Sequence, residues 1–207
     1  MTDFNLAASS WDEHPERRNR SEEIAAAVLE RVRPSAETTL LEFGCGTGVI
    51  ALALQPLVRT VLAADTAQGM LDAVKRKADA GSLRNVRTHL LTGLPGEALP
   101  ACDLIVSSMT LHHIEDPAEL FVRFFAALNC GGTVALADLE EEGGLFHPDP
   151  TGVFHNGFAH AQLEEWLCSA GFTQIEFCKA SRMRKLAADG VEREFSIFLV
   201  VAQKPAA

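Results

Sequence analysis

The sequence predicts an α/β fold in which a doubly wound, mostly parallel sheet of seven strands carries helices on both faces. Short apolar runs alternate with longer amphipathic runs along the 207 residues. The repeated strand-then-helix order indicates parallel strands, because parallel neighbours need crossover connections. Two β-rich runs that close the chain, 172–181 and 194–204, predict an antiparallel pair and hence an antiparallel C-terminal strand.

Each predicted helix has a recognisable pattern or boundary signal. The first carries apolar residues at helical spacing and stops at Pro34. The third has basic residues late and Gly81 placed to end it. The fourth opens on Asp116 with Glu119 three residues later, which is a capping box. In chain order, the predicted helices are 21–34, 48–56, 69–81, 116–129 and 161–171.

The strands between these helices are short apolar runs bounded by turn residues. No internal repeat, low-complexity tract or linker divides the chain, so we expect a single domain over residues 1–207. The five strands that precede the terminal pair are predicted at 39–43, 60–65, 86–91, 102–109 and 133–138.

The composition excludes several classes of protein. A formal net charge of −10 opposes the basic surface that phosphate backbones need, so we expect no nucleic-acid partner. No run approaches the roughly 18 apolar residues of a membrane helix, and the first twenty residues lack the apolar region of a signal peptide. We therefore expect a cytoplasmic protein without a membrane span. The five cysteines are scattered and have no C-x-x-C spacing, so neither a disulfide framework nor a zinc cage is indicated.

Three glycines follow the first predicted strand in the stretch LLEFGCGTG, residues 40–48. Such a turn offers unpaired amides and the positive end of a helix dipole, and a side chain there would hold a ligand away. The dinucleotide fingerprint G-x-G-x-x-G fits at Gly44 and Gly46, but its third position is Val49. The third glycine is Gly48 instead, so the pattern is E-x-G-x-G-x-G.

This stretch and three later motifs resemble the class I S-adenosylmethionine-dependent methyltransferases. The later motifs are AAD at 63–65, SSMTLHHIEDP at 107–117 and LNCGGTVALAD at 128–138. The likeness covers most of the chain and is greatest to the small, single-domain, ubiquinone-biosynthesis-like group, methyltransferase types 11 and 12. It implies a Rossmann-like fold, S-adenosyl-L-methionine as cofactor, and methyl transfer to an O, N, S or C atom of a small-molecule acceptor.

The resemblance also implies which residues bind the cofactor. The amides of the glycine turn suit the methionine carboxylate, and Glu42 orients this turn or the cofactor's amino group. Asp65 suits the ribose diol, because an ionised carboxylate accepts from two hydroxyls. Thr66 and Met70 are expected on the adenosine side, and the backbone near Ser107 on the methionine side. The expected cofactor-binding residues are Glu42, Gly44, Cys45, Gly46, Gly48, Asp65, Thr66, Met70, Gly93, Leu94 and Ser107.

One position departs from the family pattern. Relatives usually carry an acidic residue after the third strand that accepts from the adenine amino group, whereas this chain reads TGLPGEALP at 92–100. Leu94 stands about where that carboxylate would be, so Gly93 and Leu94 are expected to pack against the adenine ring. Glu97 is the available acidic substitute.

Three histidines are the candidate catalytic residues. His112 and His113 follow the fourth strand, near the expected acceptor, and His155 lies in a later loop. An accepting atom that carries a proton needs a base, and imidazole titrates near neutral pH. His147, His155 and His160 have spacings of eight and five residues that match no metal-ligand template, so no metal site is expected.

Two segments are expected to cover the acceptor: an N-terminal cap over residues 1–20, around Trp11, and the loop at 140–160. Two other functions stay open. A nicotinamide-dependent oxidoreductase would use the same kind of sheet, although Val49 argues against it. A binding or regulatory module would keep the S-adenosylmethionine pocket without transfer activity. The sequence leaves the acceptor and the oligomeric state, monomer or homodimer, undecided.

Overall fold

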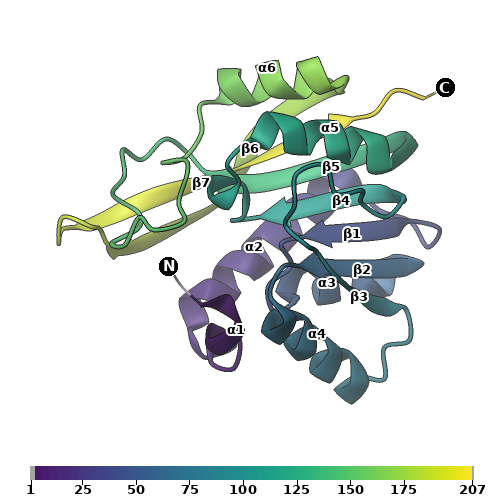
Figure 1. The fold of residues 1–207 in the computed structure, drawn as a ribbon, viewed down its shortest axis with the longest axis horizontal. Helices are drawn as coiled ribbons and strands as arrows, with labels where there is room; N and C mark the ends of the chain where they lie inside the picture. Colours follow the sequence, from purple (N-terminus) through teal and green to yellow (C-terminus); the bar gives the residue numbers. More distant parts are fainter. Residues whose placement is uncertain (1–2, 207) are drawn as a thin grey trace.

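The computed structural model describes residues 3–206. Seven strands form one sheet in the order β3-β2-β1-β4-β5-β7-β6, with helices on both sides (Figure 1). This is the doubly wound, seven-stranded sheet that the sequence predicts. The strands are β1 (Thr39–Phe43), β2 (Thr60–Asp65), β3 (Val86–Leu90), β4 (Cys102–Ser108), β5 (Leu128–Leu139), β6 (Thr173–Leu186) and β7 (Glu192–Gln203).

Strands β1 to β5 run parallel, and β7 lies antiparallel between β5 and β6. The predicted antiparallel C-terminal strand is therefore confirmed. The strand order reverses beside β1, whose two neighbours are β2 and β4. At such a switch point the connecting loops diverge and leave a crevice at the carboxyl ends of the strands, where ligands bind in open α/β sheets.

Helices cover both faces of the sheet, so the parallel strands are buried on both sides (Figure 1). On one face, α2, α3 and α4 contribute Ile24, Leu54 and Val74 to the core. On the other face, α5 and α6 contribute Phe121 and Leu163. Within residues 3–206, none of the helices combines the length and the apolar character needed to cross a membrane. The helical elements are α1 (Phe4–Ala7), η1 (Trp11–Glu13), α2 (Pro15–Val32), α3 (Val49–Leu54), η2 (Gln55–Leu57), α4 (Gln68–Ala80), η3 (Leu111–His113), α5 (Pro117–Ala127) and α6 (His160–Ala170).

Several element boundaries differ from the predicted ones. Helix α2 begins at Pro15 rather than at residue 21, because proline suits the first helical turn, and so it takes in part of the predicted cap. Residues 1 and 2 of that cap lie outside the described residues. Strand β5 begins at Leu128, where the sequence predicts the end of the preceding helix. Strand β6 continues beyond its predicted end, and β7 begins before its predicted start. Together they form a long hairpin that turns between Leu186 and Glu192 (Figure 1).

Candidate functional site

The turn after β1 is built from glycines with positive φ angles: Gly44 at +69°, Gly46 at +52° and Gly48 at +79°. A Cβ on Gly44 would lie 2.3 Å from the hydroxyl oxygen of Thr110, and one on Gly48 would lie 2.8 Å from a methyl group of Val74. A Cβ on Gly46 would meet no atom within 4 Å. Two of the glycines therefore let neighbouring elements pack against the turn, while the third borders open space that a ligand can occupy.

Two carboxylates hold the turn in position. Glu42, in β1, accepts a 2.7 Å hydrogen bond from the amide of Ala51 in α3. Asp65, the last residue of β2, accepts from the Gly46 amide at 2.8 Å and from the Ala67 amide at 2.9 Å. Each carboxylate joins the end of a strand to a neighbouring segment of backbone. The turn is thus organised in advance of binding, which reduces the ordering cost of a ligand.

Burial raises the pKa of both carboxyl groups. The pKa of Glu42 rises to about 8 because the group is buried, and the neighbouring charge of Asp65 adds to the effect of burial. Burial also raises the pKa of Asp65, against the hydrogen bonds that it accepts from backbone amides. Cys45 is buried beside both acids, and burial raises the pKa of its thiol well above the ordinary value. This thiol is therefore protonated at neutral pH and packs as an inert group.

The other predicted cofactor residues surround the same turn. The hydroxyl of Ser107 donates to the Phe43 carbonyl at 2.9 Å and so joins β4 to β1 where the turn begins. Met70 is buried in α4. Gly93 lies beside Thr66, since a Cβ on it would stand 3.6 Å from the threonine methyl group. The structure therefore brings the ends of β1, β2 and β4 and the loop after β3 to one edge of the sheet.

The loop after β3 carries no adenine-facing acid at the usual place. Leu94 is 64% exposed there, which leaves its side chain accessible to an adenine ring. Glu97, the possible substitute, accepts from the Thr92 amide at 2.8 Å and from the Gly93 amide at 3.3 Å. Partial burial opposes these hydrogen bonds, but together with Arg123 they lower the pKa of Glu97. The carboxylate is thus engaged in holding its own loop.

The N-terminal segment lies against the glycine turn. Asp12 accepts a 2.6 Å hydrogen bond from the Thr47 hydroxyl and forms a 2.6 Å ion pair with Lys77, which also donates to the Thr47 carbonyl at 2.8 Å. Asn5, in α1, accepts from the amide of Gly69 at the start of α4 at 2.9 Å. The segment is thereby attached to the turn after β1 and to the helix after β2.

Two histidines follow β4 in η3. His112 is 1% exposed, and its Nδ1 lies 2.6 Å from Oδ1 of Asp138, which is fully buried near the end of β5. Because an ionised carboxylate only accepts, Nδ1 of His112 donates to Asp138, and Nε2 takes no part in this hydrogen bond. Nδ1 of His113 lies 2.6 Å from the Gly152 carbonyl and donates to it in the same way. Both rings therefore have one nitrogen held by the protein and one nitrogen available.

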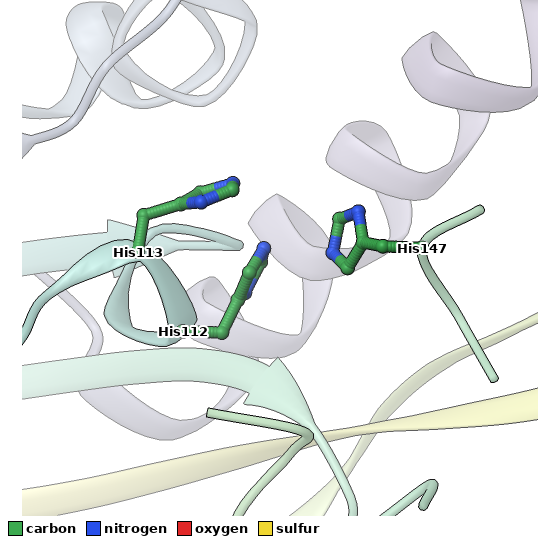
Figure 2. Close-up of side chains that lie close together, drawn as sticks. All are labelled: His112, His113 and His147. Carbon is green, nitrogen blue, oxygen red and sulfur yellow. The ribbon is translucent and has the colours of Figure 1, made fainter. Parts of the chain in front are cut away.

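A third imidazole, His147 from the loop between β5 and α6, joins this pair (Figure 2). One nitrogen from each ring lies within 4.8 Å of the other two. Nε2 of His147 is buried and has no hydrogen-bond partner among the described residues. Burial, together with the neighbouring His112 and His113, lowers the pKa of His147 to about 4. Burial, with His112 next in effect, also lowers the pKa of His113.

His155, the third predicted catalytic residue, is used elsewhere. Its Nε2 lies 3.0 Å from the carbonyl of Ile114, to which it donates. His160 pairs with Glu140 at 3.0 Å. The structure therefore groups His147 with the two histidines after β4 and not with the histidines that follow it in sequence.

The sequence analysis missed four residues of this region. Asp138 closes the motif LNCGGTVALAD, and its place at the end of β5, beside β4, was a usable signal. Thr110 lies within the motif SSMTLHHIEDP, but nothing in that motif indicates that it packs against Gly44. Asp12, which binds the turn, belongs to no motif. In the sequence, His147 stands nearest to His155 and His160, which gives no sign that it lies beside His112 and His113. Tertiary contacts alone identify these three.

The strand order, the glycine turn after β1 and the acid at the end of β2 define the class as the S-adenosylmethionine-dependent methyltransferases of class I. A family model described as a methyltransferase domain matches residues 16–189. The chain belongs to this family.

Known proteins agree with this assignment. Over 152 residues, the chain is 32% identical to the biotin biosynthesis bifunctional protein BioHC of Teredinibacter turnerae, a match that covers 67% of this chain and 26% of BioHC. The matches to the first curated relatives span between 26% and 55% of the lengths of those proteins.

Solved structures share the fold. YcgJ of Bacillus subtilis superposes with a TM-score of 0.74 at 14% identity, covering 90% of this chain and 100% of YcgJ. Phosphoethanolamine N-methyltransferase 2 of Haemonchus contortus, in complex with S-adenosylmethionine, gives a TM-score of 0.72 at 18% identity, covering 99% of this chain and 60% of that one.

Proposed function

We propose that this chain binds S-adenosylmethionine and transfers its methyl group to a small-molecule acceptor. The observation that carries the proposal is the glycine turn, in which Gly46 borders open space and Asp65 accepts a hydrogen bond from the Gly46 amide. The family membership supports the same function, and so does the S-adenosylmethionine complex of the Haemonchus contortus enzyme. A cytoplasmic location stays a prediction.

The residues of the turn fit the cofactor. Within the turn, the amides of Cys45, Gly46 and Gly48 already donate to protein acceptors. The amides proposed to donate to the methionine carboxylate are therefore those of Gly44 and Thr47. Asp65 keeps lone pairs beyond its two backbone hydrogen bonds, and these can accept from the ribose hydroxyls. When bound, the cofactor supplies a sulfonium methyl group that is already a good electrophile.

The task left to the chain is to position the acceptor, exclude water and accept a proton where the acceptor carries one. His112 is the proposed base, because Asp138 holds its Nδ1 and leaves Nε2 bare. The acceptor's proton passes to this Nε2 as the acceptor atom becomes nucleophilic. The N-terminal segment and the loop at 140–160 both contact η3 and are proposed to exclude water. Phe4 packs on the ring of His113 with centroids 5.9 Å apart, and Phe154 donates its amide to the His112 carbonyl at 2.9 Å.

The surroundings of the histidines favour an acceptor with a negative charge. Arg20, in α2, is largely buried, and its Nε has no hydrogen-bond partner among the described residues. Burial lowers the pKa of Arg20, while Asp138 is near enough to raise it. Lys185 is near enough to His147 to affect the pKa of that ring. A carboxylate or phosphate on the acceptor would pair with these cations in an otherwise acidic protein, so small acids come first in an acceptor screen.

Calorimetry with S-adenosylhomocysteine, compared with NAD, tests the proposal. We expect the protein to bind S-adenosylhomocysteine and not NAD, and we expect the Asp65→Ala variant to lose this binding. A screen for S-adenosylhomocysteine release against acids, phenols, quinols, amines and thiols then separates an enzyme from a binding module. We expect His112→Ala to lower turnover far more than cofactor affinity, with His160→Gln as the matched control. Equal losses in both quantities would refute a role on the acceptor side.

A further inference from the structure

The three imidazoles after β4 and β5 converge on one space (Figure 2). The nitrogens that His112, His113 and His147 offer lie within 4.8 Å of one another. On a tetrahedral zinc ion with Zn–N bonds of about 2.0–2.1 Å, three such nitrogens lie about 3.3 Å apart. The rings therefore need to approach one another by no more than about 1.5 Å, a movement within reach of side-chain rotation.

The atoms behind the rings are those that support metal-bound histidines. Such histidines usually donate their second ring N–H to a carboxylate or a backbone carbonyl, which fixes the tautomer and aims the other nitrogen at the ion. Here Asp138 accepts from His112 and the Gly152 carbonyl accepts from His113, each at 2.6 Å. The third ring contributes a buried Nε2 without a partner among the described residues. Buried polar atoms are nearly always satisfied, so this nitrogen calls for a ligand.

We propose that His112, His113 and His147 bind one divalent transition-metal ion of the zinc class. Imidazole nitrogens suit zinc, cobalt, nickel and copper, whereas magnesium and calcium prefer oxygen ligands. Three protein ligands leave the fourth position of a tetrahedral ion open, as in catalytic zinc sites. This set differs from the sequence set of His147, His155 and His160, for which no site is expected.

The charges around the three rings are compatible with an ion. Asp138 lies directly behind His112 and offsets part of the positive charge. The positive charge of Lys185 would repel a cation bound by the three rings. However, its Nζ donates to the Phe146 carbonyl at 2.6 Å and lies 4.1 Å from the centroid of the Phe146 ring. Arg20 is near enough to Asp138 for that acid to raise its pKa. An anionic group in the open fourth position would complete the balance.

The role of the ion rests on the proposed function, although the metal site itself does not. At the acceptor side, the open position would bind an oxygen, nitrogen or sulfur atom of the acceptor and would aim a second lone pair of that atom at the methyl group to be transferred. With the ion bound, Nε2 of His112 is a ligand, so its role as a base applies to the metal-free protein. Coordination would lower the pKa of the acceptor, so that its proton would pass to solvent as the acceptor binds and before the site excludes water.

Titration of the chelator-treated protein with Co²⁺, followed by visible d–d absorption, tests the site. We expect one four-coordinate Co²⁺ per chain, displaced by Zn²⁺. His147→Ala, which changes a half-buried loop residue, should weaken binding at least about 100-fold, and Asp138→Asn about 10- to 100-fold. His160→Gln, the matched control, should bind as the unchanged protein does. Binding to the unchanged protein that is no tighter than to His147→Ala overturns the proposal.

X-ray absorption at the zinc edge gives a test that needs no variant. Three imidazole scatterers around one zinc ion support the site, and fewer than three overturn it. S-adenosylhomocysteine calorimetry on the same samples keeps the two proposals apart. Metal binding without nucleoside binding would contradict the methyltransferase proposal and support the metal site. Nucleoside binding without metal binding would support the methyltransferase proposal and contradict the metal site.

Discussion

Alanine at Gly44 should cost more stability than alanine at Gly46, whereas alanine at Gly46 should cost more ligand affinity. Both glycines have positive φ angles, so a Cβ at either position costs roughly 1–2 kcal/mol of backbone strain. At Gly44 the new Cβ also meets the two outer atoms of the Thr110 side chain, at 2.3 and 2.5 Å. Overpacking of this kind adds about 1–3 kcal/mol. At Gly46 no atom lies within 4 Å, so only the strain applies.

The expected losses in free energy of unfolding are therefore about 1–2 kcal/mol for Gly46→Ala and about 2–5 kcal/mol for Gly44→Ala. For a chain of this size, each kcal/mol lowers Tm by about 2–4 °C. Tm should thus fall by about 2–8 °C in Gly46→Ala and by about 4–20 °C in Gly44→Ala. The order should reverse for S-adenosylhomocysteine, because the Cβ on Gly46 enters the space that the ligand needs.

Urea unfolding and calorimetry on the same preparations measure the two quantities. The double variant Gly44→Ala/Thr110→Ala removes the two nearest atoms but keeps the Cβ of residue 110 at 2.9 Å, so it should recover part of the overpacking loss. A Gly46→Ala protein that keeps full ligand affinity while losing as much stability as Gly44→Ala would refute the reasoning. The open space above the turn would then not be the ligand site.

Three further predictions concern pH, the N-terminal segment and a helix cap. Glu42 has a pKa of about 8 in the folded chain against 4.5 as its ordinary value; the native state thus holds an extra proton between these values, and the free energy of unfolding should fall as pH rises, by up to about 1.4 kcal/mol per unit. Urea unfolding from pH 5 to 8 should show a shallower fall in Glu42→Gln, and an unchanged slope would contradict the assignment. Asp12→Ala removes the hydrogen bond to Thr47 and the ion pair with Lys77. Because the side chains of Asp12 and Lys77 are about one-third exposed, these contacts are modest, and S-adenosylhomocysteine should dissociate about two- to five-fold faster in stopped-flow experiments. An unchanged dissociation rate would show that the N-terminal segment does not cover the site. Asp116→Ala loses the 3.0 Å cap on the Glu119 amide, and thermal unfolding should register a loss of about 0.5–2 kcal/mol, whereas no loss would show that the cap is replaced by water.

The sequence predicts the layers of the fold because hydrophobic periodicity is a local property. Apolar runs at 39–43, 60–65 and 102–109 are buried on both faces, and the structure finds a strand at each of them. The N-cap half of the capping box at Asp116 is confirmed by the hydrogen bond from the Glu119 amide. The other half is not formed as predicted, because the Glu119 carboxylate accepts from the Gly96 amide instead. The boundary at Leu128 was missed because a tertiary contact decides it: Leu128 pairs with Cys102 of β4, across an irregularity in the register. Pairing with a neighbouring strand overrides local helix preference there.

The sequence by itself determined the glycine turn, the acid at Asp65 and the alternation of strands and helices along the chain, since these depend on backbone conformation and on spacing along the chain. Only the tertiary structure decided which histidines work together. His147 is 34 residues beyond His113 in the numbering, and its place depends on how the loop after β5 folds back over η3. No periodicity records such a contact, because it arises from packing between segments whose separation in sequence carries no constraint on their distance in space.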